Sequence, residues 1–99
     1  MKSSNLRPAV QLFVCTNARA PDDPLRSGCG ASGPAVFAAL KRAVLSSGAG
    51  ARVWVTATGC QGHCPASGCS VAVYPRNEHL VEVVEADAPT VLRAALTPR

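Results

Sequence analysis

Five cysteines in a chain of 99 residues are the side chains best suited to chemistry, and four of them form a pattern. Cys15, Cys29, Cys60 and Cys64 are separated by thirteen, thirty and three residues. Cysteine thiolates are metal ligands, and clusters of cysteines in a reducing compartment usually bind metal or take part in catalysis. Glycines stand beside Cys29 and Cys60, which lets the backbone turn tightly and point N–H groups at sulfur. The four residues therefore predict a metal site.

The sequence favours a cytoplasmic protein with reduced cysteines. Arg7 and Pro8 interrupt the N-terminal residues before the apolar region of a signal peptide could begin. No apolar run approaches the ~20 residues that span a bilayer. The odd number of cysteines also argues against a disulfide framework.

Length and composition indicate one domain, residues 1–99, with a small core. Hydrophobic residues make up 47% of the chain, but aromatic residues only 4%, so valine, leucine and alanine must supply the core. The formal net charge is +4. The sequence contains no basic run and no stacking aromatics beside basic residues, so we expect no nucleic-acid partner.

Hydrophobic patterns predict the elements that must position the cysteines. Four strands are expected, at Val10–Val14, Arg52–Ala57, Val71–Tyr74 and Leu80–Val84. A helix should begin at Pro34, capped by Ser32 or Gly33, and end before Gly48. A closing helix should begin after Asp87 as its cap. The order β-α-β-β-β-α predicts a thioredoxin-like α/β sandwich, a four-stranded mixed sheet with a helix on each face or both helices flanking it.

This topology brings the four cysteines together. The first two strands should be parallel with a right-handed crossover, so their carboxyl ends meet at one edge of the sheet. Cys15 follows the first strand and Cys60 follows the second. Cys29 precedes the first helix, which must start at that same edge, and Cys64 shares the segment of Cys60.

The order and spacing resemble the thioredoxin-fold [2Fe-2S] ferredoxins, the family of the Shethna-type and clostridial-type proteins. In that family, one cysteine follows the first strand, and a second stands ten to thirteen residues further on. A closing pair with three intervening residues comes about thirty residues later. The matching segments here are Phe-Val-Cys15, Ser-Gly-Cys29-Gly, Gly-Cys60-Gln-Gly-His-Cys64-Pro and the Val-Ala-Val-Tyr-Pro of residues 71–75. The cysteine patterns of plant-type and two-cluster bacterial ferredoxins do not occur in this chain.

The resemblance covers residues 9–96 and implies a one-electron carrier, not an enzyme. By this resemblance Cys15, Cys29, Cys60 and Cys64 are the ligands of a single [2Fe-2S] cluster, and the protein is a homodimer that packs through its sheet. The family often has Gly-Pro where this chain has Gly68-Cys69, and a Trp-Tyr pair where it has His79-Leu80.

Other interpretations of the four cysteines remain open. Zinc accepts four cysteine ligands, although structural zinc sites usually use two closely spaced pairs. The cysteines could also be small buried hydrophobic residues, although most of them stand in glycine-rich or polar segments. Zinc would make the chain a structural or interaction domain of the same fold. An iron–sulfur sensor or cluster carrier is a further alternative.

The remaining candidate residues have simpler expected roles. We expect Cys69 to be a packing residue at the start of the third strand, and His79 to be an exposed turn residue. We expect His63 to lie near the cluster without being a ligand. Trp54 should belong to the core or to a dimer interface.

Two arginines bear on the partner. Arg19 and Arg26 stand between the first and second cysteines of the pattern. They suggest that the redox partner presents an acidic docking surface near its electron port.

Overall fold

The computed structural model describes residues 1–4, 8–16, 32–59 and 68–97. Within these ranges the elements follow the expected order β-α-β-β-β-α, with one short 3₁₀ turn before the last helix. They are β1 (Val10–Cys15), α1 (Ser32–Ser47), β2 (Val53–Thr58), β3 (Cys69–Tyr74), β4 (Glu78–Val83), η1 (Glu85–Asp87) and α2 (Ala88–Leu96).

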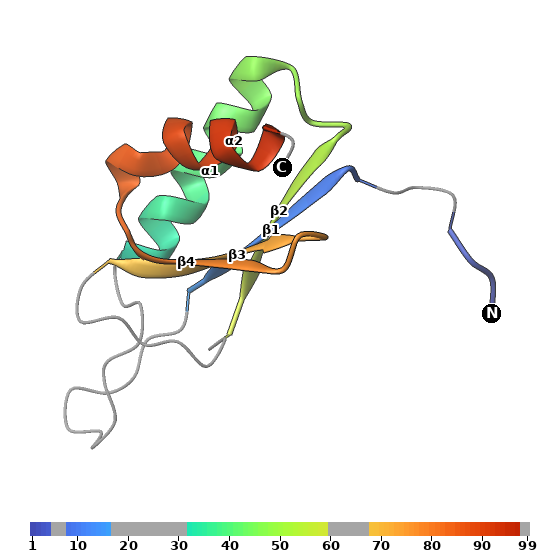
Figure 1. The fold of residues 1–99 in the computed structure, drawn as a ribbon, viewed down its shortest axis with the longest axis horizontal. Coiled ribbons are helices and arrows are strands. Elements are labelled where there is room, and N and C mark those ends of the chain that lie inside the picture. The colour runs from blue at the N-terminus through green and yellow to red at the C-terminus, as the bar shows by residue number, and fades with distance from the viewer. Residues whose placement is uncertain (5–7, 17–31, 60–67, 98–99) are drawn as a thin grey trace.

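The four strands form one mixed sheet in the order β2-β1-β3-β4. β1 and β2 are parallel, whereas β1 with β3 and β3 with β4 are antiparallel. Both helices lie on the same face of the sheet (Figure 1). The structure is therefore a two-layer α/β sandwich, and of the two helix placements that the sequence left open, the one-sided placement is correct.

The core lies between this face and the helices. Leu12 and Val14 alternate along β1 and are fully buried, as the strand pattern requires. On α1, Val36, Leu40 and Val44 form the expected helical stripe and are also buried. Leucine, valine, alanine and cysteine supply every buried hydrophobic residue of the described chain, which confirms the small-residue core.

The expected element ends needed correction in two places. α1 begins at Ser32, so Pro34 stands inside its first turn, where a missing N–H costs nothing. Asp87 does not cap α2 with its side chain. Its carboxylate instead accepts a hydrogen bond of 3.0 Å from the backbone N–H of Val84, which closes the 3₁₀ turn in front of α2.

Arg76 fastens the end of α2 to the turn between β3 and β4. Its guanidinium donates hydrogen bonds to the carbonyls of Ala95 at 3.0 Å and Thr97 at 2.7 Å, and lies 3.9 Å from the carboxylate of Glu78. These contacts satisfy carbonyl groups that the helix itself leaves without partners.

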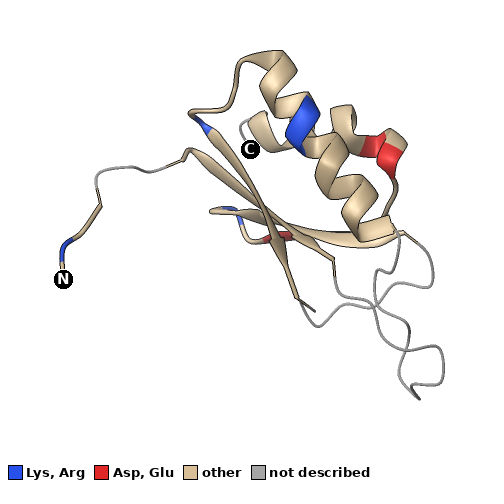
Figure 2. Ribbon diagram, turned by 180° about the vertical axis from the view of Figure 1, so that it is seen from behind, with Lys and Arg blue, Asp and Glu red and all other residues tan. Residues whose placement is uncertain are grey.

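The second face of the sheet is open, since none of the described helices covers it (Figure 2). Trp54 and Tyr74 are 41% and 37% exposed. The expectation that Trp54 belongs to the core is therefore wrong, and its alternative role at an interface remains open. His79 is exposed as expected, but it lies in β4 and not in a turn. Among the described residues no helix is long and apolar enough to cross a membrane.

Two leucines of α1 test the position of the core. Leu40 is fully buried and Leu45 is 74% exposed. We expect Leu40→Ala to lower the free energy of unfolding by about 2–5 kcal/mol, because it leaves a cavity. Leu45→Ala should change it by less than about 0.5 kcal/mol. Urea unfolding followed by circular dichroism measures both values, and equal losses would contradict the packing described here.

Candidate metal centre

Cys15 is the one member of the four-cysteine set that lies in the described part of the chain. It is the last residue of β1, carries a free thiol and is 1% exposed. Cys29, Cys60 and Cys64 lie outside the described residues, as do His63, Arg19 and Arg26. The site is therefore built from Cys15 and from the described ends of the segments that carry the other three cysteines.

The carboxyl ends of β1 and β2 meet at Cys15. Cys15 is paired with Thr58 in the parallel register. One residue further, the backbone N–H and the hydroxyl of Thr16 both donate to the carbonyl of Thr58, at 3.0 and 3.2 Å. In return, the hydroxyl of Thr58 donates to the carbonyl of Val14 at 3.4 Å. These hydrogen bonds of Thr16 and Thr58, called the threonine clamp below, join the two strand ends on both sides of Cys15.

The threonine clamp also fixes the start of the segment that carries Cys60. The hydroxyl of Thr58 lies 3.0 Å from the carbonyl of Gly59 as well as near Val14. Gly59 is the residue directly before Cys60. The chain therefore enters the segment of the third and fourth cysteines from a fixed point beside Cys15, as the parallel-strand argument predicts.

The first turn of α1 packs directly on the backbone of Cys15. A Cβ added to Gly33 would lie 2.8 Å from the Cα of Thr16 and would overlap the carbonyl of Cys15. Only glycine therefore allows this approach. Cys29 stands three positions before Ser32, the first residue of α1. The segment with the second cysteine thus ends at the same place.

A second glycine fixes the other end of the segment that carries Cys60 and Cys64. Gly68 has a φ of 70°, and a Cβ there would lie 2.6 Å from the backbone carbon of Glu82. The next residue, Cys69, is fully buried at the start of β3. This confirms the expectation that Cys69 is a packing residue.

The chemistry available at this edge follows from one buried thiol and one helix end. The N-terminal end of α1 carries partial positive charge, which stabilises negative charge nearby by about 0.3–1 kcal/mol. In residues 1–4, 8–16, 32–59 and 68–97, no three His, Cys, Asp or Glu side chains gather into a metal site. The described residues therefore supply one sulfur ligand and the frame around it.

Sequence reasoning missed the residues that build this frame. The two threonines, Gly33 and Gly68 each hold a strand or helix end next to a cysteine-bearing segment. Hydroxyl residues at the ends of two predicted parallel strands were the available signal for the threonine clamp. From the sequence, Gly33 indicates only a helix cap.

Comparison with solved structures finds similarity to a thioredoxin-like ferredoxin. The wild-type thioredoxin-like [2Fe-2S] ferredoxin from Aquifex aeolicus matches with a TM-score of 0.77 and 25% identity, over 88% of this chain and 84% of that one. Two of its variants, each with one cysteine replaced by serine, match with TM-scores of 0.79 and 25% identity, over 88% of this chain and 86% of theirs. The fold is thioredoxin-like.

The thioredoxin-like similarity extends over nearly the whole described fold, which confirms the expected fold class. The two cysteines replaced in the Aquifex variants stand four positions apart in that chain, the same separation as Cys60 and Cys64 here. No protein-family model and no curated protein matches this chain.

The close approach of α1 to Cys15 yields a direct test. We expect Gly33→Ala to lower the free energy of unfolding by about 1–3 kcal/mol, because the new methyl group must displace the backbone of Cys15 and Thr16. Gly50→Ala is the matched control, since a Cβ at Gly50 meets no atom within 4 Å. It should leave stability unchanged or slightly raise it. Urea unfolding of both variants checks the difference, and an unaffected Gly33→Ala variant would contradict the contact.

Proposed function

We propose that this chain is a one-electron carrier that holds a single [2Fe-2S] cluster through Cys15, Cys29, Cys60 and Cys64. The observation that carries the proposal is the position of Cys15. It stands where β1, β2 and the start of α1 converge, in a chain whose fold is similar to that of a [2Fe-2S] ferredoxin.

The donor set fits this group. Four cysteine thiolates are the full ligand set of a [2Fe-2S] cluster. Four thiolates around such a core carry net negative charge, and the start of α1 offers the complementary partial charge. Cys15 is buried, which agrees with a ligand held away from water. The described ends at Gly59 and Gly68 leave the closing pair in one short connection between β2 and β3.

The bound cluster would supply a site that accepts and releases one electron. The chain's part is to keep Cys15 in place, through the threonine clamp and the contact of Gly33, whichever oxidation state is present. A rigid frame of this kind limits rearrangement on electron transfer, as preorganised sites do. We propose a carrier without enzymatic activity.

Metal analysis of anaerobically purified protein tests the cluster type. We expect two irons and two acid-labile sulfides per chain, with an EPR signal that appears only after one-electron reduction. The reason is that the cysteine spacing matches none of the other ferredoxin patterns. Stoichiometric zinc and a colourless protein would support the structural-domain alternative instead, and four irons per chain would contradict the proposed cluster.

Serine substitutions test the ligand assignment. We expect Cys15→Ser and Cys60→Ser to abolish or strongly shift the visible absorption and to lower the iron content. Cys69→Ala is the control, since Cys69 is buried in β3 beyond the cysteine-bearing segment. It should lower stability modestly and leave the spectrum nearly unchanged. A variant at Cys69 that loses its iron, beside a Cys64→Ser variant that keeps it, would overturn the assignment.

We further propose that the chain forms a homodimer through the open face of the sheet. Three aromatic residues lie on this face: Phe13, Trp54 and Tyr74. The rings of Phe13 and Tyr74 meet edge to face with centroids 5.6 Å apart. The rings of Tyr74 and His79 also meet edge to face, with centroids 6.3 Å apart. Exposed aromatic side chains are common where two proteins meet. The departure from the family's pattern at His79 lies within this aromatic group.

Analytical ultracentrifugation tests the dimer. We expect a dimer at micromolar concentration, and a monomer for Tyr74→Asp, which places a charge in the middle of the aromatic face. Thr90→Asp, exposed on α2 on the other side of the molecule, is the appropriate control and should remain dimeric. A monomeric wild-type chain would contradict the dimer.

The proposed carrier is a single cytoplasmic domain, residues 1–99, that exchanges electrons with protein partners. We propose that these partners present acidic groups, because the chain has a net charge of +4 and carries Arg19 and Arg26 in the segment before Cys29.

A further inference from the structure

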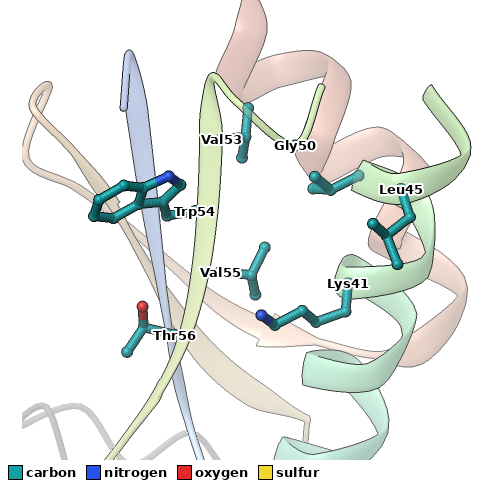
Figure 3. A pocket seen from close by; sticks show the side chains of 8 residues that line it. Lys41, Leu45, Gly50, Val53, Trp54, Val55 and Thr56 are labelled. Atoms are coloured by element: carbon teal, nitrogen blue, oxygen red, sulfur yellow. The ribbon is translucent and has the colours of Figure 1, made fainter. Parts of the chain in front are cut away.

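A groove of about 370 Å³ runs between the second half of α1 and β2 (Figure 3). Val53 and Val55 point from β2 toward the helix and form an apolar floor with Val44. Leu45 stands on the helical rim and is 74% exposed. The valine floor itself is nearly buried, at 2–6% exposure, so Leu45 on the rim is the apolar side chain of the groove that a partner can cover.

The sheet side of the groove is an edge strand. β2 stands at the end of the strand order and pairs with β1 along one side only. The outer side of an edge strand presents backbone N–H and C=O groups to any extended chain that approaches it. Such strand addition combines main-chain hydrogen bonds with pockets for alternate side chains, and the groove offers such a pocket.

The charge around the groove defines its occupant. Lys41 is the charged residue of the lining, and its side chain extends from α1 toward Val55 (Figure 3). Arg52 directly precedes β2. Neither residue pairs with a carboxylate of the described chain.

The acidic residues of the described chain lie outside the groove lining. They belong to η1 and to β4, which stands at the other end of the strand order from β2: Glu78, Glu82, Glu85 and Asp87. Glu78 and Glu85 already have Arg76 and Arg42 as basic partners, whereas Lys41 and Arg52 have no carboxylate partner in the described chain. Charge complementarity favours an acidic segment at the β2 edge.

We propose that this groove docks an extended acidic segment of a partner protein, which adds to β2 as a further strand. Its apolar side chains enter the groove beside Leu45, above the nearly buried Val53 and Val55, and a carboxylate pairs with Lys41. The proposal rests on the proposed function only in taking the partner to be an electron donor or acceptor. β2 ends at Thr58, next to Cys15, so a segment docked here would bring its protein beside Cys15.

Trp54 provides a built-in reporter, because it is the single tryptophan of the chain and lies on β2. The probe is a short synthetic peptide of alternating glutamate and valine, blocked at both ends. A strand added beside β2 places its side chains within reach of the Trp54 indole. We expect saturable binding that shifts the tryptophan emission of the purified protein. The same peptide with lysine in place of glutamate should cause no shift.

Two charge variants separate the groove from the overall charge. Lys41→Glu should weaken binding roughly ten-fold, because it reverses the charge that faces the peptide. Arg93→Glu changes the net charge by the same amount on the exposed side of α2, away from the groove, and should bind as the wild type does. Equal affinities for the two variants would overturn the proposed site.

Backbone methylation tests strand addition itself. Two versions of the peptide carry methyl groups on alternate backbone nitrogens, one version on the odd and the other on the even positions. Successive N–H groups of a strand point to opposite sides, so only one version loses the N–H groups that face β2. We expect one methylated peptide to bind normally and the other to fail. Equal behaviour of the two would overturn the strand mode. The groove could instead take a second copy, with the β2 edge of one copy on the β4 edge of the next. A mass that grows with concentration, together with no peptide binding, would show this and overturn the proposed partner. Iron content is measured separately, so a failed cluster proposal and a failed groove remain distinguishable.

Discussion

The contact between Gly33 and the backbone of Cys15 and Thr16 is the constraint on which the candidate metal site depends. A helix cannot start against a strand end unless its first turn lacks a side chain at the point of closest approach. Glycine at this position brings the positively polarised end of α1 within van der Waals contact of the peptide that carries the Cys15 thiol. Any larger residue would move the helix outward, and the buried environment of Cys15 would open with it.

The same site shows how a small core can still hold an accurate geometry. Valine, leucine and alanine bury modest area, so packing alone leaves little stability to spare. Side-chain hydrogen bonds at the strand and helix ends add to the stability that this core supplies. The threonine clamp joins the ends of β1 and β2, and Arg76 joins the end of α2 to the turn after β3. Side-chain hydrogen bonds thus support two ends of the sheet, in addition to its backbone pairing and its apolar contact with the helices.

Local sequence pattern predicted the element order, the parallel first pair of strands and the convergence of strand ends at one edge. These features follow from periodicity and chain direction, both of which are visible in a single sequence. The pattern did not predict which face of the sheet the helices cover. Trp54 shows the reason: a strand alternates between two faces, but alternation alone does not say which face is buried.

The supporting residues of the site were also beyond prediction, for a different physical reason. Thr16 and Thr58 are 42 positions apart, and the hydrogen bond between them exists only after β1 and β2 have paired in their register. The requirement for glycine at 33 depends on the distance between a helix and a strand, which no local pattern encodes. The cap predicted at Asp87 is wrong because a carboxylate can cap a 3₁₀ turn as well as an α-helix.

The arrangement separates the surfaces of the molecule by chemistry. One face of the sheet packs against both helices, the opposite face carries aromatic residues, and the β2 edge carries the groove with Lys41. Cys15 lies where β1 and β2 end, next to the last residue of β2. Docking along β2 would therefore bring a partner beside Cys15, while self-association would use the opposite face of the sheet. In a carrier this separation matters, because an electron must reach the cluster while the partner is still bound.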